Sequence, residues 1–384
     1  MTRGTEVPVT PEVLRWAIAD SGYSNHDIAE HLRVSEAVVA SWENGSARPL
    51  LSQFKNLVSL LKRPSAAFFL PSPPETHKPE VKFRGPKEND QRALSPKERQ
   101  LIRQAARIQE SMSWLSKEFD VQRPRLSKTS ISVKSDSIAD DTRSSLEIGI
   151  ARQLTWPSAS IAFKEWRSAT DNLGVYVFLL PMGENSCRGF SLWNPRAPVI
   201  AVNTAWNYQA RIFTLFHELG HLITRTDSAC KSGGNFALTK HSDHTERWCE
   251  KFAAAVLLPW KPVRAYITEY YAWTEGRSIS NLDVVYDIAS KFKVSARAAA
   301  LRLIQQKAAS WDLYRKIPPI SDAKKIARGG HGRVRQEISE ENYGLKTAKL
   351  LLRGTDERYL TIADTVDYLR IKDTDLDAYR EHND

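Results

Sequence analysis

Three ionisable residues stand inside an apolar stretch, FTLFHELGHLIT, at residues 213–224. They are His217, Glu218 and His221, and most of their neighbours are Phe, Leu or Ile. Burying such groups without partners is costly, so a bound metal ion is the natural compensation. Residues four apart lie on one face of a helix, so two imidazoles can bind one ion while Glu218 deprotonates a water. The pattern predicts zinc hydrolase chemistry, against the alternative of a helix with exposed histidines.

A catalytic zinc also needs a third protein ligand and one open position. The longer H-E-x-x-H-x-x-G-x-x-H pattern would put this ligand at Asp227, but it requires glycine where this chain has Thr224. Glu246 is favoured instead, because it begins the amphipathic segment HTERWCEKFAAAVLLP, whose apolar face would pack on the core. Glu250, one turn later, is predicted to orient a ligating imidazole. The remaining alternatives are Cys230, His241 and His244.

The composition indicates a soluble cytoplasmic protein. The chain has 384 residues, of which 41% are hydrophobic and 26% charged, enough for two or three domains. Its three cysteines are far apart, which suits a reducing cytosol better than a disulfide framework. No signal peptide is recognisable and no apolar run would span a membrane, so we expect no membrane partner. The net charge of +10 is compatible with an anionic partner.

Hydrophobic periodicity predicts a mainly helical α+β chain. Three segments rich in Val, Phe and Ile, at 174–181, 187–193 and 197–204, are expected to form a small sheet before the helix that carries the histidines. Helices are expected at 97–119, 145–156, 160–174, 244–259 and 284–306, with two short ones in the tail. The predicted divisions are a helix-turn-helix domain at 1–74, a linker and helical connector at 75–135, a catalytic domain at 136–310 and a C-terminal helical extension at 311–384.

Two further features bear on catalysis. The strand PVIAVN, residues 198–203, either forms a sheet edge that binds an extended peptide by main-chain pairing or is an ordinary core strand. Arg302 is a cation in an apolar helix, and either stabilises an oxyanion or forms a salt bridge. The sequence leaves both alternatives open.

The segment NHDIAEHLRVSEAVVASWENG has helix-turn-helix spacing, with its second helix starting near Ser35. The exposed positions of that helix, including Glu36 and Ala40, lack the Arg, Lys, Asn or Gln that reads base edges. Residues 1–74 contain seven basic and seven acidic residues, so this region has no excess of positive charge that would attract DNA. Arg33 and Arg48 remain candidates for phosphate contacts. The domain is therefore predicted to bind DNA or a protein partner through these five residues.

Several segments together resemble the ImmA/IrrE family of metallopeptidases. They are FTLFHELGHLIT, ERWCEKFAAAVLLP, the upstream RGFSLWNPRAPVIAVN and the downstream FKVSARAAALRL, and SAAFFLPSPP resembles the junction to an N-terminal XRE-type helix-turn-helix. The resemblance covers roughly residues 11–75 and 140–310, and more weakly the tail. It implies a zincin-like metallopeptidase domain with His217, His221 and Glu246 as ligands and Glu218 as base. The family often has Asn where this chain has Glu250.

The resemblance also implies a function. A zinc-dependent endopeptidase of this kind cleaves a regulatory protein, typically a helix-turn-helix repressor, and so relieves repression. One zinc per chain is the expected cofactor, with manganese as an alternative in the cell. The competing interpretation is a DNA-binding regulator, or an antitoxin-like protein, whose metallopeptidase domain senses or binds rather than cuts.

Overall fold

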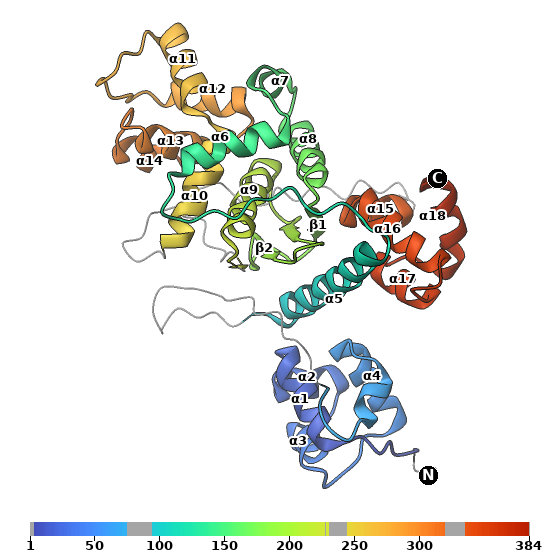
Figure 1. The fold of residues 1–384 in the computed structure, drawn as a ribbon. Helices are drawn as coiled ribbons and strands as arrows, with labels where there is room; N and C mark the ends of the chain where they lie inside the picture. The colour runs from blue at the N-terminus through green and yellow to red at the C-terminus, as the bar shows by residue number, and fades with distance from the viewer. Residues whose placement is uncertain (1–3, 75–93, 227, 230–243, 319–334, 384) are drawn as a thin grey trace. The chain divides into compact units, whose positions relative to one another are not determined.

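The structure is a computed structural model that describes residues 4–74, 94–226, 228–229, 244–318 and 335–383. The chain divides into two compact units, residues 1–79 with 92–104 and residues 80–91 with 105–384. Helix α5 (Pro96–Glu118) contributes its first residues to one unit and the remainder to the other. The predicted mainly helical α+β class is confirmed (Figure 1). Among the described residues, no helix is both long and apolar enough to cross a membrane.

The first unit is a bundle of short helices around one apolar core. Its elements are α1 (Pro11–Ser21), α2 (Asn25–Leu32), α3 (Glu36–Asn44), α4 (Leu51–Leu61) and the 3-10 helix η1 (Ser65–Phe69). Ser24 caps α2 by accepting a hydrogen bond from the amide of Asp27, which satisfies one of the free donors at the helix start. Arg33 adopts a left-handed conformation with φ of 55°, so the chain turns between α2 and α3 where the sequence predicts the turn.

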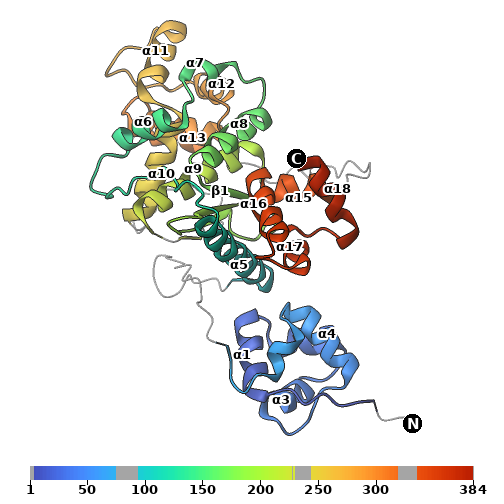
Figure 2. The ribbon, with the colours of Figure 1, turned by 45° about the vertical axis from the view of Figure 1, so that its right-hand side comes forward.

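The second unit contains the remaining helices. They are α6 (Ser135–Leu146), α7 (Ile150–Thr155), α8 (Ala159–Asn172), α9 (Tyr208–Thr224), α10 (His244–Leu257), α11 (Trp260–Tyr271), α12 (Leu282–Phe292), α13 (Ala296–Gln305), α14 (Trp311–Lys316), α15 (Arg335–Tyr343), α16 (Leu345–Asp356), α17 (Ile362–Leu369), the 3-10 helix η2 (Asp373–Asp375) and α18 (Leu376–Asn383). Figure 2 shows the last helices, α15 to α18, gathered in one cluster.

Three helix predictions need correction. The helix predicted at 145–156 is the end of α6 followed by the separate α7, because Glu147 turns left-handed with φ of 56°. The helix predicted at 284–306 is likewise α12 and α13, divided at Lys293 with φ of 60°. Ser295 then caps α13 by accepting from the amide of Ala298. In the tail from about residue 318, the described residues form four α-helices, α15 to α18, where the sequence predicts two.

The sheet has four strands in the order β1-β3-β2-β4. They are β1 (Tyr176–Leu180), β2 (Gly189–Leu192), β3 (Val199–Asn203) and the two-residue β4 (Ser228–Ala229). Strand β3 pairs in parallel with β1 and antiparallel with β2. It is an inner strand with every residue buried, so of the two alternatives left open for PVIAVN the core strand is correct and the sheet edge is wrong.

Helix α9 packs directly on this sheet. Asn207 caps it by accepting from the amide of Ala210, and all its residues from Ala210 to Thr224 are buried. Gly189 of β2 permits the close approach, because a Cβ there would lie 2.5 Å from Cγ2 of Thr214 and 2.6 Å from the carbonyl oxygen of Ala201. The helix that carries the histidines is therefore held against the sheet by a residue without a side chain.

Helix α10 packs against α9 at a second glycine (Figure 1). A Cβ at Gly220 would lie 3.1 Å from Sγ of Cys249 and 3.2 Å from Cδ1 of Phe252, both on α10. The stacked rings of Trp248 and Phe252 belong to the buried face of the same helix. Gly220 thus sets how closely the two helices can lie.

We predict that Gly220→Ala loosens the α9–α10 contact. Alanine would favour the helix by about 1 kcal/mol over glycine, but overpacking at Cys249 and Phe252 costs about 1–3 kcal/mol. We expect a net loss of stability in denaturant unfolding, together with weaker binding of divalent metal. Gly149→Ala is the matched control, because a Cβ there has no atom within 4 Å. Unchanged metal affinity in Gly220→Ala would show that the packing does not set the position of α10.

Candidate metal centre

The structure brings three of the predicted site residues together. Nε2 of His217 lies 3.1 Å from Nε2 of His221 and 3.2 Å from Oε2 of Glu246. Nε2 of His221 lies 3.4 Å from Oε1 of Glu246. Ligand atoms of the three residues all lie within 4.8 Å of one another, with both histidines buried and Glu246 partly buried. Two helices contribute to this cluster, α9 with the histidines and α10 with the carboxylate.

The electrostatics of the cluster favour positive charge. Burial acts to lower the pKa of His217, but its hydrogen bond and attraction to Glu246 outweigh burial and raise the pKa to about 9. Burial acts to raise the pKa of Glu246, yet hydrogen bonds and attraction from the two imidazoles hold that pKa far below its ordinary range. The carboxylate therefore remains ionised and attracts a cation to the two imidazoles.

The remaining ionisable residue of the motif, Glu218, is fully buried on α9. Its Cγ lies 3.5 Å from the position that a Cβ of Gly189 would take, so β2 covers this side chain. The adjacent position on the helix puts Glu218 beside the histidine pair, as the sequence predicts.

A residue that the sequence analysis missed contacts His221. Oγ1 of Thr226 lies 3.0 Å from Nδ1 of His221, and the Thr226 amide donates to the His221 carbonyl oxygen at 2.9 Å. Arg225 ends α9 in a left-handed conformation with φ of 59°, which returns Thr226 toward the histidine. This contact favours a proton on Nδ1 and leaves Nε2 directed at the other donors. The only sequence signal is a threonine five residues after the second histidine.

Glu250 does not make the hydrogen bond to a histidine that its predicted orienting role requires. Among the described residues, no hydrogen bond joins Glu250 to either imidazole. Burial raises the pKa of Glu250, while the charge of His217 opposes that shift. The hydrogen-bonding contact with an imidazole therefore comes from Thr226 and not from Glu250.

The other candidate ligands divide into two groups. Asp227, Cys230 and His241 lie outside the described residues. His244 is exposed at the first residue of α10, and it is not part of the cluster of donors. The oxyanion candidate Arg302 is buried, pairs with Asp136 and donates from Nε to the carbonyl oxygen of Leu258 at 2.9 Å. The salt-bridge explanation thus accounts for Arg302.

The residues of the N-terminal domain that are candidates for binding DNA or a partner all lie at the surface of the first unit. Arg33, Ser35, Glu36 and Arg48 are exposed, and Ala40 is partly exposed. The carboxylate of Glu36 lies 2.8 Å from Nδ1 of His26, so this position of α3 is engaged with α2. The exposed face thus carries a carboxylate and small side chains at the start of α3.

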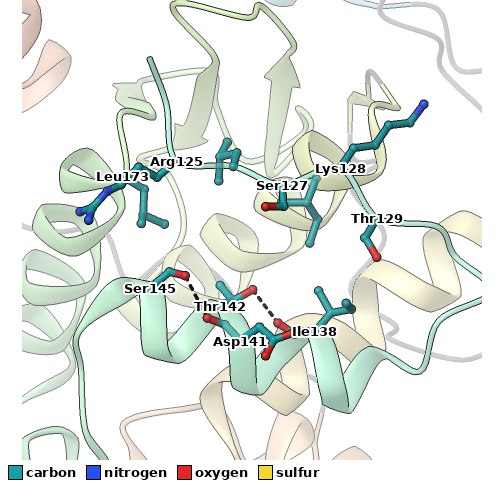
Figure 3. Close-up of a pocket in the computed structure, with 11 residues that line it drawn as sticks. Arg125, Ser127, Lys128, Thr129, Ile138, Asp141, Thr142, Ser145 and Leu173 are labelled. Atoms are coloured by element: carbon teal, nitrogen blue, oxygen red, sulfur yellow. Dashed lines mark hydrogen bonds between the residues drawn. The ribbon is translucent and has the colours of Figure 1, made fainter. Parts of the chain in front are cut away.

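Two concavities lie beside the C-terminal end of α9. One is lined by Lys128–Ile131 together with Thr224, Thr226 and Thr245, so it reaches the threonine that contacts His221 and the residue before Glu246. The second, about 310 Å³, shares Lys128 and Thr129 and is bounded by α6. Figure 3 shows the segment 125–129 facing Ile138, Asp141, Thr142 and Ser145 of α6 across this space.

The donor set of the cluster fits a divalent metal. Two imidazole nitrogens and one carboxylate oxygen are the three protein ligands of one class of catalytic zinc site. Their mutual distances, and the positive charge that Glu246 attracts, agree with a cation among them.

The comparison with protein families supports the same conclusion. Residues 170–303 match the model of the IrrE N-terminal-like domain, Peptidase_M78. The resemblance inferred from the sequence is confirmed for this region, which includes β1 to β4 and the cluster of donors. The match does not extend to the N-terminal residues 1–74.

A curated relative is similar to part of the chain. The chain is 28% identical over 180 residues to "Radiation response metalloprotease IrrE" of Deinococcus radiodurans. The alignment covers 46% of this chain and 48% of the relative, so the chain spans about half the length of the curated relative that it matches.

We predict that Thr226→Val weakens metal binding. Valine keeps the shape of the side chain but removes the oxygen that lies 3.0 Å from Nδ1 of His221. Losing a partner of this kind lowers metal affinity by about 10- to 100-fold. Competition with a metal-binding dye measures the affinity, and Thr155→Val, at the exposed end of α7, is the control. Equal affinity in wild type and Thr226→Val would exclude an orienting role for Thr226.

Proposed function

We propose that this protein is a metal-dependent endopeptidase that cleaves a regulatory protein. The observation that carries the proposal is the cluster of His217, His221 and Glu246, whose donor atoms lie within 4.8 Å beside the buried Glu218. The three donors would hold one zinc ion, or manganese in the cell. The family match of residues 170–303 and the similarity to a metalloprotease support the same activity.

The chemistry divides between the metal and the chain. A divalent metal bound by the three donors would supply Lewis-acid polarisation of the scissile carbonyl and lower the pKa of water. The Glu218 carboxylate accepts a proton from the attacking water and delivers it to the leaving amine. Thr226 holds the His221 ring in place. The sheet and α9 exclude bulk water from Glu218, which is fully buried.

We further propose that the substrate lies in the concavity beside the donors. Its lining is mostly hydroxyl side chains, with Thr129, Ser130, Thr224, Thr226 and Thr245. Such groups and nearby main chain can hydrogen-bond an extended peptide with little dependence on its side chains. Selection of the substrate would then depend on contacts made away from the donors.

A helix-turn-helix repressor is the proposed substrate class. The exposed α3 face of the first unit, with Ser35, Glu36 and Ala40, suits docking to a protein more than reading of base edges. Binding the regulator at that face would raise its effective concentration at the donors without new contacts there. Cleavage between the DNA-reading and dimerising parts of a repressor would relieve repression.

The alternative function is a DNA-binding regulator whose peptidase domain senses or binds without cutting. The exposed Arg33 and Arg48 favour it, because they are available to contact phosphates. Tight operator binding without cleavage of any protein would support this alternative against the peptidase.

We predict that Glu218→Gln retains metal and fold but loses cleavage. The amide can hydrogen-bond water but cannot accept its proton, so the rate should fall by about 100-fold or more. The metal-loaded protein is incubated with a repressor of the same regulatory system and, separately, with unfolded casein. Comparable cleavage by Glu218→Gln and wild type would exclude Glu218 as the base. Efficient digestion of casein beside an untouched repressor would indicate a general peptidase.

A further inference from the structure

A third cavity, about 340 Å³ in volume, lies in the larger unit away from the cluster of donors. Four separate segments line it: residues 121–125 after α5, residues 171–176 from the end of α8 to the start of β1, Arg196 between β2 and β3, and one face of α16. None of the three metal-site donors contributes to its lining. The cavity therefore forms a site of its own.

The lining is strongly cationic. It contains six basic side chains and one acidic side chain, Asp171; the basic ones are Arg123, Arg125, Arg196, Lys346, Lys349 and Arg353. Within the described part of the chain, Arg353 alone of these six forms an ion pair with a carboxylate, that of Glu357. Lys346 donates instead to the main-chain oxygen of Asp171 at 2.8 Å. Positive charge thus exceeds negative charge in this concave space, and the excess attracts anions.

Helix α16 contributes three of these cations from one face. Lys346, Lys349 and Arg353 are spaced by three and four residues, so they lie side by side on the helix. Like charges at this spacing destabilise a helix, and Leu350 between them is buried. An anion bound in the cavity would relieve that repulsion.

The cavity also offers apolar surface. Tyr176, Leu173 and Leu350 line it, and all three are buried. The guanidinium of Arg353 lies 4.0 Å from the ring centroid of Phe119, which fixes this cation at the edge of the space. A ligand with an anionic group and an organic part would use both kinds of surface.

We propose that this cavity binds a small phosphorylated molecule of the nucleotide class. Arginine presents a planar fork that matches phosphate oxygens, and lysine adds a point charge, so the lining carries both elements of a phosphate site. The concave shape and limited volume favour a small ligand over a strand of nucleic acid, which needs an extended cationic track. The ring of Tyr176 and the two leucines take the organic part of the ligand.

One segment of the chain joins this cavity to the concavity beside the metal donors. The extended segment that begins with Val121 lines this cavity and continues to Ile131, in the concavity beside the metal donors. Main-chain hydrogen bonds hold it at two points, from Arg125 to Leu173 at 2.8 Å and from Thr129 to Ile223 at 2.9 Å. A ligand bound to Arg123 and Arg125 would hold the first part of this segment, whose later part lines the concavity beside the donors.

Isothermal titration calorimetry on the full-length protein tests the proposal, with ATP, pyrophosphate, adenosine and a short single-stranded DNA as probes. The test variant is Arg123→Gln with Lys349→Gln, which removes two exposed cations of the cavity. The matched control is Arg277→Gln with Lys164→Gln, an exposed pair that does not line it. A background of His217→Ala with His221→Ala separates this site from phosphate bound at the metal. Cleavage is not measured, so failure here is distinct from failure of the peptidase proposal.

We expect ATP and pyrophosphate to bind and adenosine not to bind. The test variant should weaken ATP binding by roughly tenfold or more, since each charge-assisted contact contributes on the order of one decade of affinity. The control variant and the metal-site background should bind ATP as the wild type does. Absence of ATP binding, equal losses in test and control variants, or adenosine binding as well as ATP would each overturn the proposal. Stronger binding of the DNA than of ATP would also overturn it and assign the surface to nucleic acid.

Discussion

The close approach of α9 and α10 at Gly220 is the contact on which the rest of the site depends. The histidines and Glu218 lie on α9, whereas Glu246 lies on α10, so the donors converge only if the helices are close. A Cβ at Gly220 would meet Cys249 and Phe252 at 3.1 to 3.2 Å, which leaves space for no larger side chain without a shift. Gly189 allows a similarly close approach on the other side of α9, where β2 meets the helix. Two residues without side chains therefore hold the charged groups in position between a sheet and a helix.

Charge in an apolar surrounding is the second constraint. His217, Glu218 and His221 are buried among the apolar side chains of α9, and such groups are stable there only with compensating partners. Glu246 supplies negative charge to the imidazoles and keeps the pKa of His217 raised to about 9. The same arrangement would attract a divalent cation. Nε2 of His221 lies beside the other donors, while its Nδ1 contacts Oγ1 of Thr226.

Local patterns in the sequence predict the helices that carry the site residues. They do not predict the features that depend on contacts between distant segments. Helical spacing places His217 and His221 on one face, and the amphipathic pattern after residue 244 places Glu246 at the start of α10. The sheet order is not local information, so the inner position of β3 could not be predicted from PVIAVN. Left-handed residues such as Glu147 and Lys293 divide helices without interrupting the apolar period. The contact of Thr226 with His221 depends on a reversal of the chain after α9. The cationic cavity depends on segments that are distant in the sequence, so residue spacing predicts neither feature.

The central claim is that His217, His221 and Glu246 together hold one divalent metal. Metal content of the purified protein, measured by mass spectrometry for wild type and Glu246→Ala after the same dialysis against a weak chelator, tests it most directly. Glu250→Ala is the matched control, because it removes a carboxylate one turn later on the same helix. The account predicts about one metal per wild-type chain, a similar content in Glu250→Ala and a large loss in Glu246→Ala, with all three proteins folded. Equal metal in wild type and Glu246→Ala, or none in the wild type after loading with zinc, would contradict the account.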